Sequence, residues 1–158
     1  MLNKIISGGE TGASQAAWKA ASSYRVSTGG WMPAGFPTEA GPRPEFAERY
    51  GAAELPMEGG PGRAERNVQD SDATLWFGET TTSCARETVG ACQKLGKQCL
   101  PVYPGASFQP SHVAAWIAEN KIRTLNVAGN REGEEIGIGD RVERFLDLVL
   151  RELGHERA

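Results

Sequence analysis

Short continuous apolar runs alternate along this chain with longer segments whose apolar residues recur at helical spacing. A short continuous apolar run is typical of a buried strand, whereas a helical period is typical of an amphipathic helix. The runs predict strands over residues 2–7, 73–77, 99–103 and 124–127. The periodic segments predict helices over residues 13–23, 63–70, 84–95, from 110 or 111 to about 120, and from 139 or 140 to about 153.

This alternation indicates one α/β domain over residues 1–158, with a mostly parallel sheet covered by helices on both faces. The run Ala73–Phe77 supports a parallel sheet, because it is continuously apolar, as strands buried on both faces are. Ligands of such sheets bind beyond the carboxyl ends of the strands. We therefore expect three polar loops on one edge of the sheet, at residues 8–12, 78–83 and 129–132.

The segment from Gly29 to Gly62 interrupts the alternation. It contains eight of the 20 glycines and six of the nine prolines, which disfavour helices and central strands. It also carries Trp31, Phe36 and Tyr50, so it is too apolar for a simple linker. We expect an ordered loop over about 29–62 that wraps the domain and lines a pocket. The alternative is a flexible surface insertion.

Composition narrows the class of protein. A net charge of -3 argues against a nucleic-acid surface, which would need a basic patch. No apolar run approaches the roughly 20 residues that span a bilayer, and the first expected strand begins without a preceding signal peptide. The cysteines, Cys84, Cys92 and Cys99, show no metal-ligand spacing, so we expect no metal site and a reduced, cytoplasmic environment.

The loop after the first expected strand is a candidate site for a phosphate-bearing ligand. It contains Gly8, Gly9, Glu10, Thr11 and Gly12. Its glycines suit a tight turn, and the helix that follows directs free N–H groups and its positive dipole end into the loop. A carboxylate repels phosphate, so Glu10 is expected to contact a sugar hydroxyl or a base edge. The structural alternative is a tight turn with close helix packing, since the spacing matches no dinucleotide fingerprint.

The other two loops carry further groups that suit an anion. A run of four hydroxyls precedes a helix, where hydroxyl and amide donors favour phosphate, although an N-cap needs only one such residue. This run is Thr80, Thr81, Thr82 and Ser83. The loop after the last expected strand contains Gly129, Asn130 and Arg131. The guanidinium fork of Arg131 suits an oxyanion, and the alternative is a solvated surface arginine.

Two acidic residues and the candidate nucleophiles indicate a function less specifically than these loops do. Asp70 and Asp72 either cap and turn the chain, or support the ligand loops, or contact a metal or a hydroxyl. His112 and His155 lie away from the expected edge, so no histidine serves as a base for a nucleophile there. Cys84 at a helix start could be a reactive thiol, but an inert buried cysteine is the favoured interpretation.

Five motifs together resemble the molybdenum cofactor carrier family. They are Ser7-Gly8-Gly9-Glu10-Thr11-Gly12, Gly29-Gly30-Trp31-Met32-Pro33, Glu39-Ala40-Gly41-Pro42, Arg66-Asn67-Val68-Gln69-Asp70-Ser71-Asp72 and Leu125-Asn126-Val127-Ala128-Gly129. The resemblance covers residues 4 to 150. It implies a Rossmann-like three-layer sandwich, homo-oligomers, and binding of a phosphorylated pterin, molybdopterin, that is protected and passed to a molybdoenzyme. It places Gly30 and Trp31 among the ligand-binding residues.

The chain also departs from this resemblance. Ser14 and Gln15 stand where the family often has an Asp-Arg pair, so a charged contact is lost. The related cytokinin-activating phosphoribohydrolases use a glycine-rich phosphate motif, of which Glu87 remains. One alternative function is therefore a nucleoside-monophosphate phosphoribohydrolase with Glu87 or Glu10 as its catalytic carboxylate. Another is a sensor of a nucleotide-derived ligand without catalysis.

Overall fold

The computed structural model describes residues 1–102 and 108–158. The strands are β1 (Lys4–Ile6), β2 (Ser27–Met32), β3 (Ala52–Glu54), β4 (Ala73–Phe77), β5 (Gln98–Val102) and β6 (Thr124–Gly129). The helices are α1 (Ala13–Ser23), α2 (Phe46–Tyr50), α3 (Arg63–Gln69), α4 (Ser83–Leu95), α5 (Pro110–Glu119) and α6 (Ile138–Glu152). Every element expected from the sequence is present within about two residues. The expected strand end at Tyr103 lies outside the described residues.

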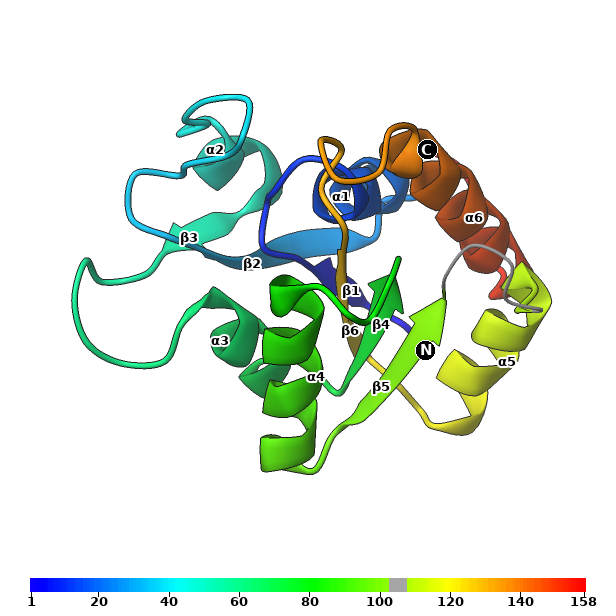
Figure 1. The fold of residues 1–158 in the computed structure, drawn as a ribbon. Coiled ribbons are helices and arrows are strands. Elements are labelled where there is room, and N and C mark those ends of the chain that lie inside the picture. Colours follow the sequence, from blue (N-terminus) through cyan, green and yellow to red (C-terminus); the bar gives the residue numbers. More distant parts are fainter. Residues whose placement is uncertain (103–107) are drawn as a thin grey trace.

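The described strands form one wholly parallel sheet in the order β3-β2-β1-β6-β4-β5. Ile5 of β1 lies between Thr28 of β2 and Leu125 of β6. The chain builds outward from β1 to β3, crosses to β4 and β5, and returns to insert β6 beside β1 (Figure 1). The α/β, Rossmann-like fold expected from the sequence is confirmed.

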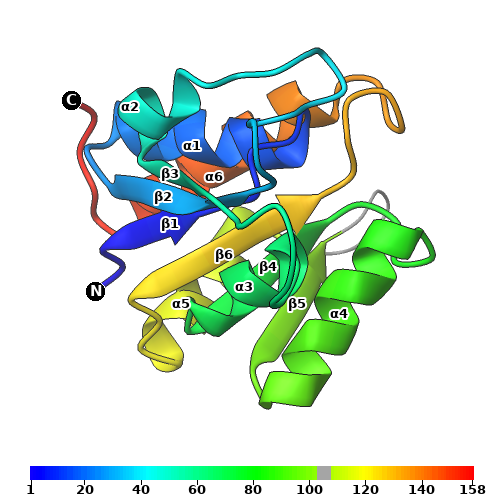
Figure 2. The same ribbon diagram turned by 90° about the vertical axis from the view of Figure 1, so that its left-hand side faces the viewer.

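Helices cover both faces of the sheet in a three-layer arrangement (Figures 1 and 2). Helices α1, α5 and α6 lie on one face over the largest apolar core, which includes Leu75, Leu125 and Val127. Helices α3 and α4 lie on the other face over a smaller apolar cluster. The strand residues between those core positions, Thr74 and Asn126, are buried and polar. This second face therefore departs from the apolar surface that a doubly covered parallel strand normally presents.

The segment over residues 29–62 is more regular than an ordered loop. It contains the end of β2, all of α2 and all of β3. The glycines that argue against a strand permit this one: Gly30 has a φ of 130°, and a Cβ there would meet the backbone of Ser7. Trp18 of α1 stacks on Tyr50 with ring centroids 4.8 Å apart, which anchors α2 in a separate apolar cluster.

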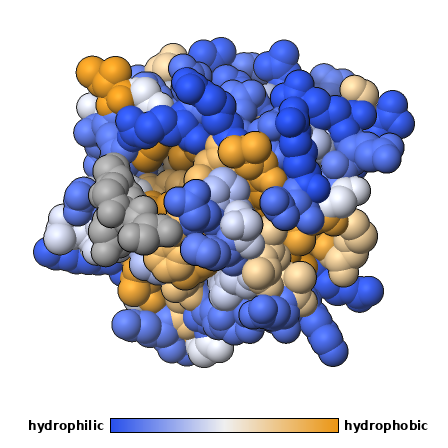
Figure 3. Space-filling view, turned by 90° about the vertical axis from the view of Figure 1, so that its right-hand side faces the viewer, coloured by the Kyte–Doolittle hydropathy of each residue, from blue (hydrophilic) through white to orange (hydrophobic). Residues whose placement is uncertain are grey.

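The surface over α5 and α6 carries apolar side chains among hydrophilic ones (Figure 3). Leu148 in α6 keeps 48% of its area exposed, and Phe108 before α5 keeps 39%. Across the described residues, none of the helices combines the length and the apolar character that a bilayer crossing requires.

Candidate functional site

The loops that follow β1 and β6 meet at the middle of the sheet edge, where these strands are neighbours. The Ala13 amide donates to the Asn130 carbonyl at 3.3 Å. Gly12 lies at this contact with a φ of 81°, and a Cβ there would come within 2.5 Å of the Asn130 carbonyl oxygen and 2.7 Å of the Glu132 nitrogen. Both its backbone conformation and the lack of space therefore require glycine at this position.

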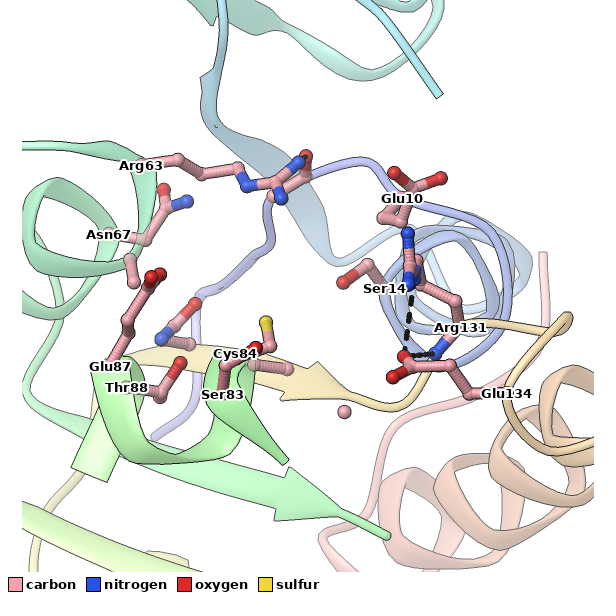
Figure 4. Close-up of a pocket in the computed structure, with 15 residues that line it drawn as sticks. Glu10, Ser14, Arg63, Asn67, Ser83, Cys84, Glu87, Thr88, Arg131 and Glu134 are labelled. Carbon is pink, nitrogen blue, oxygen red and sulfur yellow. Dashed lines mark hydrogen bonds and ion pairs between the residues drawn. The ribbon is translucent and has the colours of Figure 1, made fainter. Parts of the chain in front are cut away.

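A cavity of about 240 Å³ lies beside this contact, on the face covered by α3 and α4 (Figure 4). Its walls come from the loop after β1, the start of α1, helix α3, the first turns of α4, and the end of β6 with its loop. The lining residues are Gly8, Glu10, Ser14, Arg63, Ala64, Asn67, Ser83, Cys84, Glu87, Thr88, Asn126, Ala128, Gly129, Arg131 and Glu134.

The cavity borders the buried polar side chains of the second face. Asn126 of β6 and Thr88 of α4 each keep only 2% of their area exposed. The Asn126 amide Nδ2 donates to Thr74 Oγ1 at 3.2 Å, which fixes it beneath the cavity. Burying polar groups costs free energy unless they are hydrogen-bonded, so amide and hydroxyl groups at this depth favour a ligand that offers donors and acceptors.

Arg63, at the first position of α3, is the cation of the cavity without an ion-pair partner among the described residues. Its Nη1 donates to the Gly8 carbonyl at 3.2 Å, which holds the side chain across the loop after β1. Figure 4 shows it entering from the side opposite to Arg131. A carbonyl group is neutral, so this hydrogen bond leaves the positive charge of the guanidinium uncompensated. The other N–H groups of the guanidinium remain available to bind an oxyanion bidentately.

Arg131 is already compensated by two carboxylates. Its Nε lies 3.2 Å from Glu134 Oε1 and 3.9 Å from Glu39 Oε2. The hydrogen bond to Glu134, with the charge of that carboxylate, raises the pKa of Arg131 above its ordinary value. An anion that binds Arg131 must therefore compete with these two side chains.

Glu39 fastens the segment after β2 to the sheet edge. Its carboxylate accepts hydrogen bonds from the Thr11 hydroxyl and, at 2.7 Å, from the Gly133 amide. These bonds hold the pKa of Glu39 below its ordinary value, with the Thr11 hydroxyl as the largest cause. Glu10 Oε1 completes the junction by accepting from the amides of Thr11 and Glu39, both at 2.9 Å. Glu10 therefore organises backbone amides beside the cavity.

Glu87 differs from the other carboxylates of the cavity. It lies on α4 one turn after the helix start and lines the wall near Asn67 (Figure 4). Among the described residues, its carboxylate has neither a hydrogen bond nor an ion pair within the protein. It is thus available to a ligand as an acceptor or a base.

Six of the residues selected from the sequence line this cavity together: Gly8, Glu10, Ser83, Glu87, Gly129 and Arg131. Several others surround it. Gly9 packs against Met32, Gly30 against Ser7, and Asn130 beneath Gly78. Thr11 and Gly12 lie on the outer side of the loop, against Glu39 and Glu132.

The remaining selected residues have structural contacts elsewhere. Trp31 Nε1 donates to Asp70 at 2.6 Å, with Arg66 stacked on the indole ring. Asp72 accepts from the Arg123 and Thr124 amides at the start of β6, the opposite edge of the sheet. In the hydroxyl run, Thr82 caps α4 by accepting from the Ala85 amide at 3.2 Å. Thr80 borders a separate hollow, and Thr81 lines neither.

Sequence reasoning missed Arg63, Asn67, Thr88, Asn126 and Glu134 as cavity residues. The first two come from α3, whose position over the sheet is not evident from its sequence. A signal did exist for Asn126, because a polar residue inside a short apolar parallel strand is unusual. Cys84 also lines the cavity, and burial raises its pKa above the ordinary value, opposite to what an activated thiol requires.

The fold is that of a Rossmann-like α/β protein, with a cavity at the carboxyl edge of its parallel sheet, where ligands of such sheets bind. Residues 5–150 match the circularly permutated YpsA SLOG family, and the chain belongs to this family. It is also similar to a crystal structure from Syntrophus aciditrophicus SB described as a "Putative molybdenum carrier protein". That protein shares 32% identity and a TM-score of 0.84, over 94% of this chain and 95% of the other. No curated protein matches the chain.

The crowding at Gly12 generates a stability prediction. Gly12→Ala should destabilise the fold by more than the ~1–3 kcal/mol expected for an unfavourable backbone conformation, because its Cβ would also collide with Asn130 and Glu132. Gly154→Ala is the matched control, since Gly154 has a φ of 89° with nothing within 4 Å of the added carbon. Urea unfolding of both variants measures the difference, and equal losses would contradict a role for crowding.

The lowered pKa of Glu39 generates a pH prediction. A carboxylate with a depressed folded-state pKa stabilises the protein above its unfolded-state pKa, and this contribution is lost as pH falls through the folded-state pKa. Glu39→Gln should therefore be less stable than the unchanged protein at neutral pH, and the difference in stability should vanish as the pH falls below the folded-state pKa of Glu39. Glu156→Gln controls for charge alone. A difference that persists unchanged at low pH would contradict the assignment.

Proposed function

We propose that this protein is a carrier that binds the molybdenum cofactor, a phosphorylated pterin, at the carboxyl edge of its sheet. The observation that carries the proposal is the cavity itself, which combines the uncompensated Arg63 guanidinium with buried amide and hydroxyl groups. The name of the similar Syntrophus protein, a molybdenum carrier, supports the carrier role and molybdenum as part of what is carried.

The chemistry of the cavity fits the two ends of such a ligand. Arg63 suits the phosphate because a guanidinium pairs with its oxygens bidentately. Asn126, Thr88 and Glu87 offer donors and acceptors for the edge of a pterin ring. The cavity is smaller than the roughly 300–1,000 Å³ typical of ligand pockets, so the ligand would extend beyond it. Among the described residues no cluster of three potential metal ligands occurs, so the proposal assigns the protein no metal ligand of its own.

Transfer to a molybdoenzyme and self-association complete the proposal. A carrier must release its ligand, and a ligand that projects from an open edge of the sheet remains accessible to a recipient. A homo-oligomer in the cytoplasm is part of the same proposal, and light scattering on the purified protein measures its size.

Anaerobic binding tests the ligand. The purified protein is mixed with isolated molybdenum cofactor and desalted, and the retained pterin and molybdenum are assayed. We expect both to stay with the protein. A folded protein that retains neither would contradict the carrier function.

Arg63→Gln tests the phosphate contact. Loss of a charge-assisted hydrogen bond, worth ~1.5–3 kcal/mol, should weaken cofactor binding by about 10- to 100-fold. Arg123→Gln removes the same charge at the opposite edge of the sheet and should leave the affinity unchanged. Equal affinities for both variants would exclude Arg63 as the phosphate ligand. The carrier function itself is decided by the anaerobic binding experiment.

Glu87 favours a second candidate function, a nucleoside-monophosphate phosphoribohydrolase. Its carboxylate lines the same cavity as Arg63 and has no protein partner among the described residues, as a base or an oxocarbenium stabiliser would require. If this function is correct, nucleoside monophosphates should release free base, and Glu87→Gln should slow the release by about 100-fold or more. Chromatography of the products measures this, and an absence of free base would exclude the hydrolase.

A further inference from the structure

The part of the cavity bounded by α3, the first turns of α4 and β6 contains polar atoms that the protein leaves unpaired. Asn67, Thr88 and Asn126 line the cavity, and each keeps only 2% of its area exposed. Glu87 also lines the cavity but is exposed, so it lies where the cavity opens to solvent. Buried polar groups in folded proteins nearly always have hydrogen-bond partners. Unpaired atoms at this depth therefore indicate where a ligand supplies the missing partners.

The Asn67 carboxamide presents a donor to the cavity. Its Oδ1 accepts from the Trp31 amide at 2.8 Å, and its Nδ2 donates to the Trp31 carbonyl at 3.1 Å, so the backbone fixes its orientation. Figure 4 shows the nitrogen of this side chain pointing into the cavity. An amide nitrogen carries two hydrogens, and the second one has no acceptor among the described residues. The carboxamide cannot turn over to present its oxygen without losing both bonds to Trp31.

Glu87 presents two acceptors near this donor. Its carboxylate points from the start of α4 toward Asn67 (Figure 4). Within the described part of the chain, neither carboxylate oxygen accepts a hydrogen bond or pairs with a cation. The two side chains therefore offer one donor and two acceptors to a single ligand.

Asn126 adds an acceptor in the same cavity. Its Nδ2 donates to Thr74 Oγ1 at 3.2 Å, which leaves its Oδ1 without a partner in the described residues. The Thr88 hydroxyl, next to Glu87 in α4, has no printed partner within these residues either and can accept as well as donate. These atoms can accept the second N–H of an amino group whose first N–H faces Glu87.

We propose that Glu87 and Asn67 recognise the 2-amino-4-oxo edge of a fused pyrimidine ring, with Glu87 as the residue that sets ligand specificity. This edge presents an amino group, a ring N–H and a carbonyl oxygen side by side. A carboxylate accepts from the two adjacent N–H groups bidentately, and the free N–H of Asn67 donates to the carbonyl oxygen. The inference rests on the proposed function, because a pterin carries this edge and its phosphate is assigned to Arg63.

Two classes of phosphorylated ligand share this edge, the pterins and the guanine nucleotides. A lumazine differs from a pterin in having an oxygen in place of the 2-amino group, and hypoxanthine differs from guanine in lacking that amino group. Without the amino group, a carboxylate oxygen of Glu87 loses its donor, and in a lumazine it faces another oxygen. A site built to bind an N–H group discriminates strongly against a ligand that lacks it.

Binding of matched ligand pairs to the full chain tests the proposal. One pair is neopterin monophosphate and its 2-oxo analogue, a lumazine. The other pair is guanosine monophosphate and inosine monophosphate. Calorimetric titration at neutral pH measures each Kd. We expect the 2-amino member of at least one pair to bind about 10- to 100-fold more tightly, as the loss of a hydrogen bond to a charged group predicts. The 2-amino ligand with the lower Kd identifies the class of ligand.

Glu87→Gln makes the outcome specific. Glutamine has nearly the same shape but replaces one acceptor with a donor, so the preference for the 2-amino ligand should fall below about threefold. The ratio of the two affinities is the readout, because a general loss of structure weakens both ligands and leaves the ratio unchanged. Glu119→Gln, in α5 on the other face of the sheet, removes the same charge and should keep the full ratio.

The proposal is overturned if the two members of each pair bind equally, if none of the ligands binds, or if Glu87→Gln keeps the preference. Equal affinities within both pairs, in a protein that retains the molybdenum cofactor anaerobically, would contradict this inference and leave the carrier function standing. Selective binding of guanosine monophosphate by a protein that retains no cofactor would support the inference and contradict the carrier function.

Discussion

The close approach of α1 to the loop after β6 is the constraint on which the sheet edge depends. A Cβ at Gly12 would meet the backbone of Asn130 and Glu132, and one at Gly129 would meet Phe77 and Ala13. The start of α1, the end of β4 and the end of β6 with its loop therefore meet at distances that only glycine permits. This contact joins the start of α1 to the loop after β6. On the other face, α3 and α4 cover a smaller apolar cluster, and the buried polar side chains of Thr74 and Asn126 lie beside it. The cavity borders these polar side chains, on the face of the sheet that α3 and α4 cover.

Charge within the cavity is distributed unevenly between its two arginines. Arg131 is held by Glu134 and approached by Glu39, whereas Arg63 is held by a carbonyl group. An incoming anion therefore meets one cation that is already satisfied and one that is not. Glu39 also attaches the segment after β2 to the sheet edge, so the same carboxylate contributes to local order and to the charge around the cavity.

The sequence predicted much of the fold because five segments show the helical period and four short apolar runs are continuous, as buried strands are. It missed β2, α2 and β3 because the glycines and prolines of residues 29–62 disfavour regular structure, although the tight contact with Ser7 requires glycine at Gly30. Because these elements were missed, the position of α3 could not be predicted, and neither could its contribution to the cavity. Arg63 and Asn67 reach the cavity only because the crossover from β3 sets α3 across the sheet. The meeting of loops at one edge followed from a general rule of parallel sheets, whereas side-chain pairing such as Arg131 with Glu134 depends on packing that periodicity does not encode.

Asn67 takes part in the hydrogen bonding of the sheet and also lines the cavity. Strand β1 ends at Ile6 while β2 continues to Met32, which leaves the Trp31 backbone without a strand on that side. The Asn67 carboxamide accepts from the Trp31 amide at 2.8 Å and donates to the Trp31 carbonyl at 3.1 Å. One side chain thus imitates the peptide group of a missing strand. Because Asn67 also lines the cavity, the edge of the β-ladder is itself part of the cavity wall, and a ligand in this cavity would touch the hydrogen-bonding framework of the sheet directly.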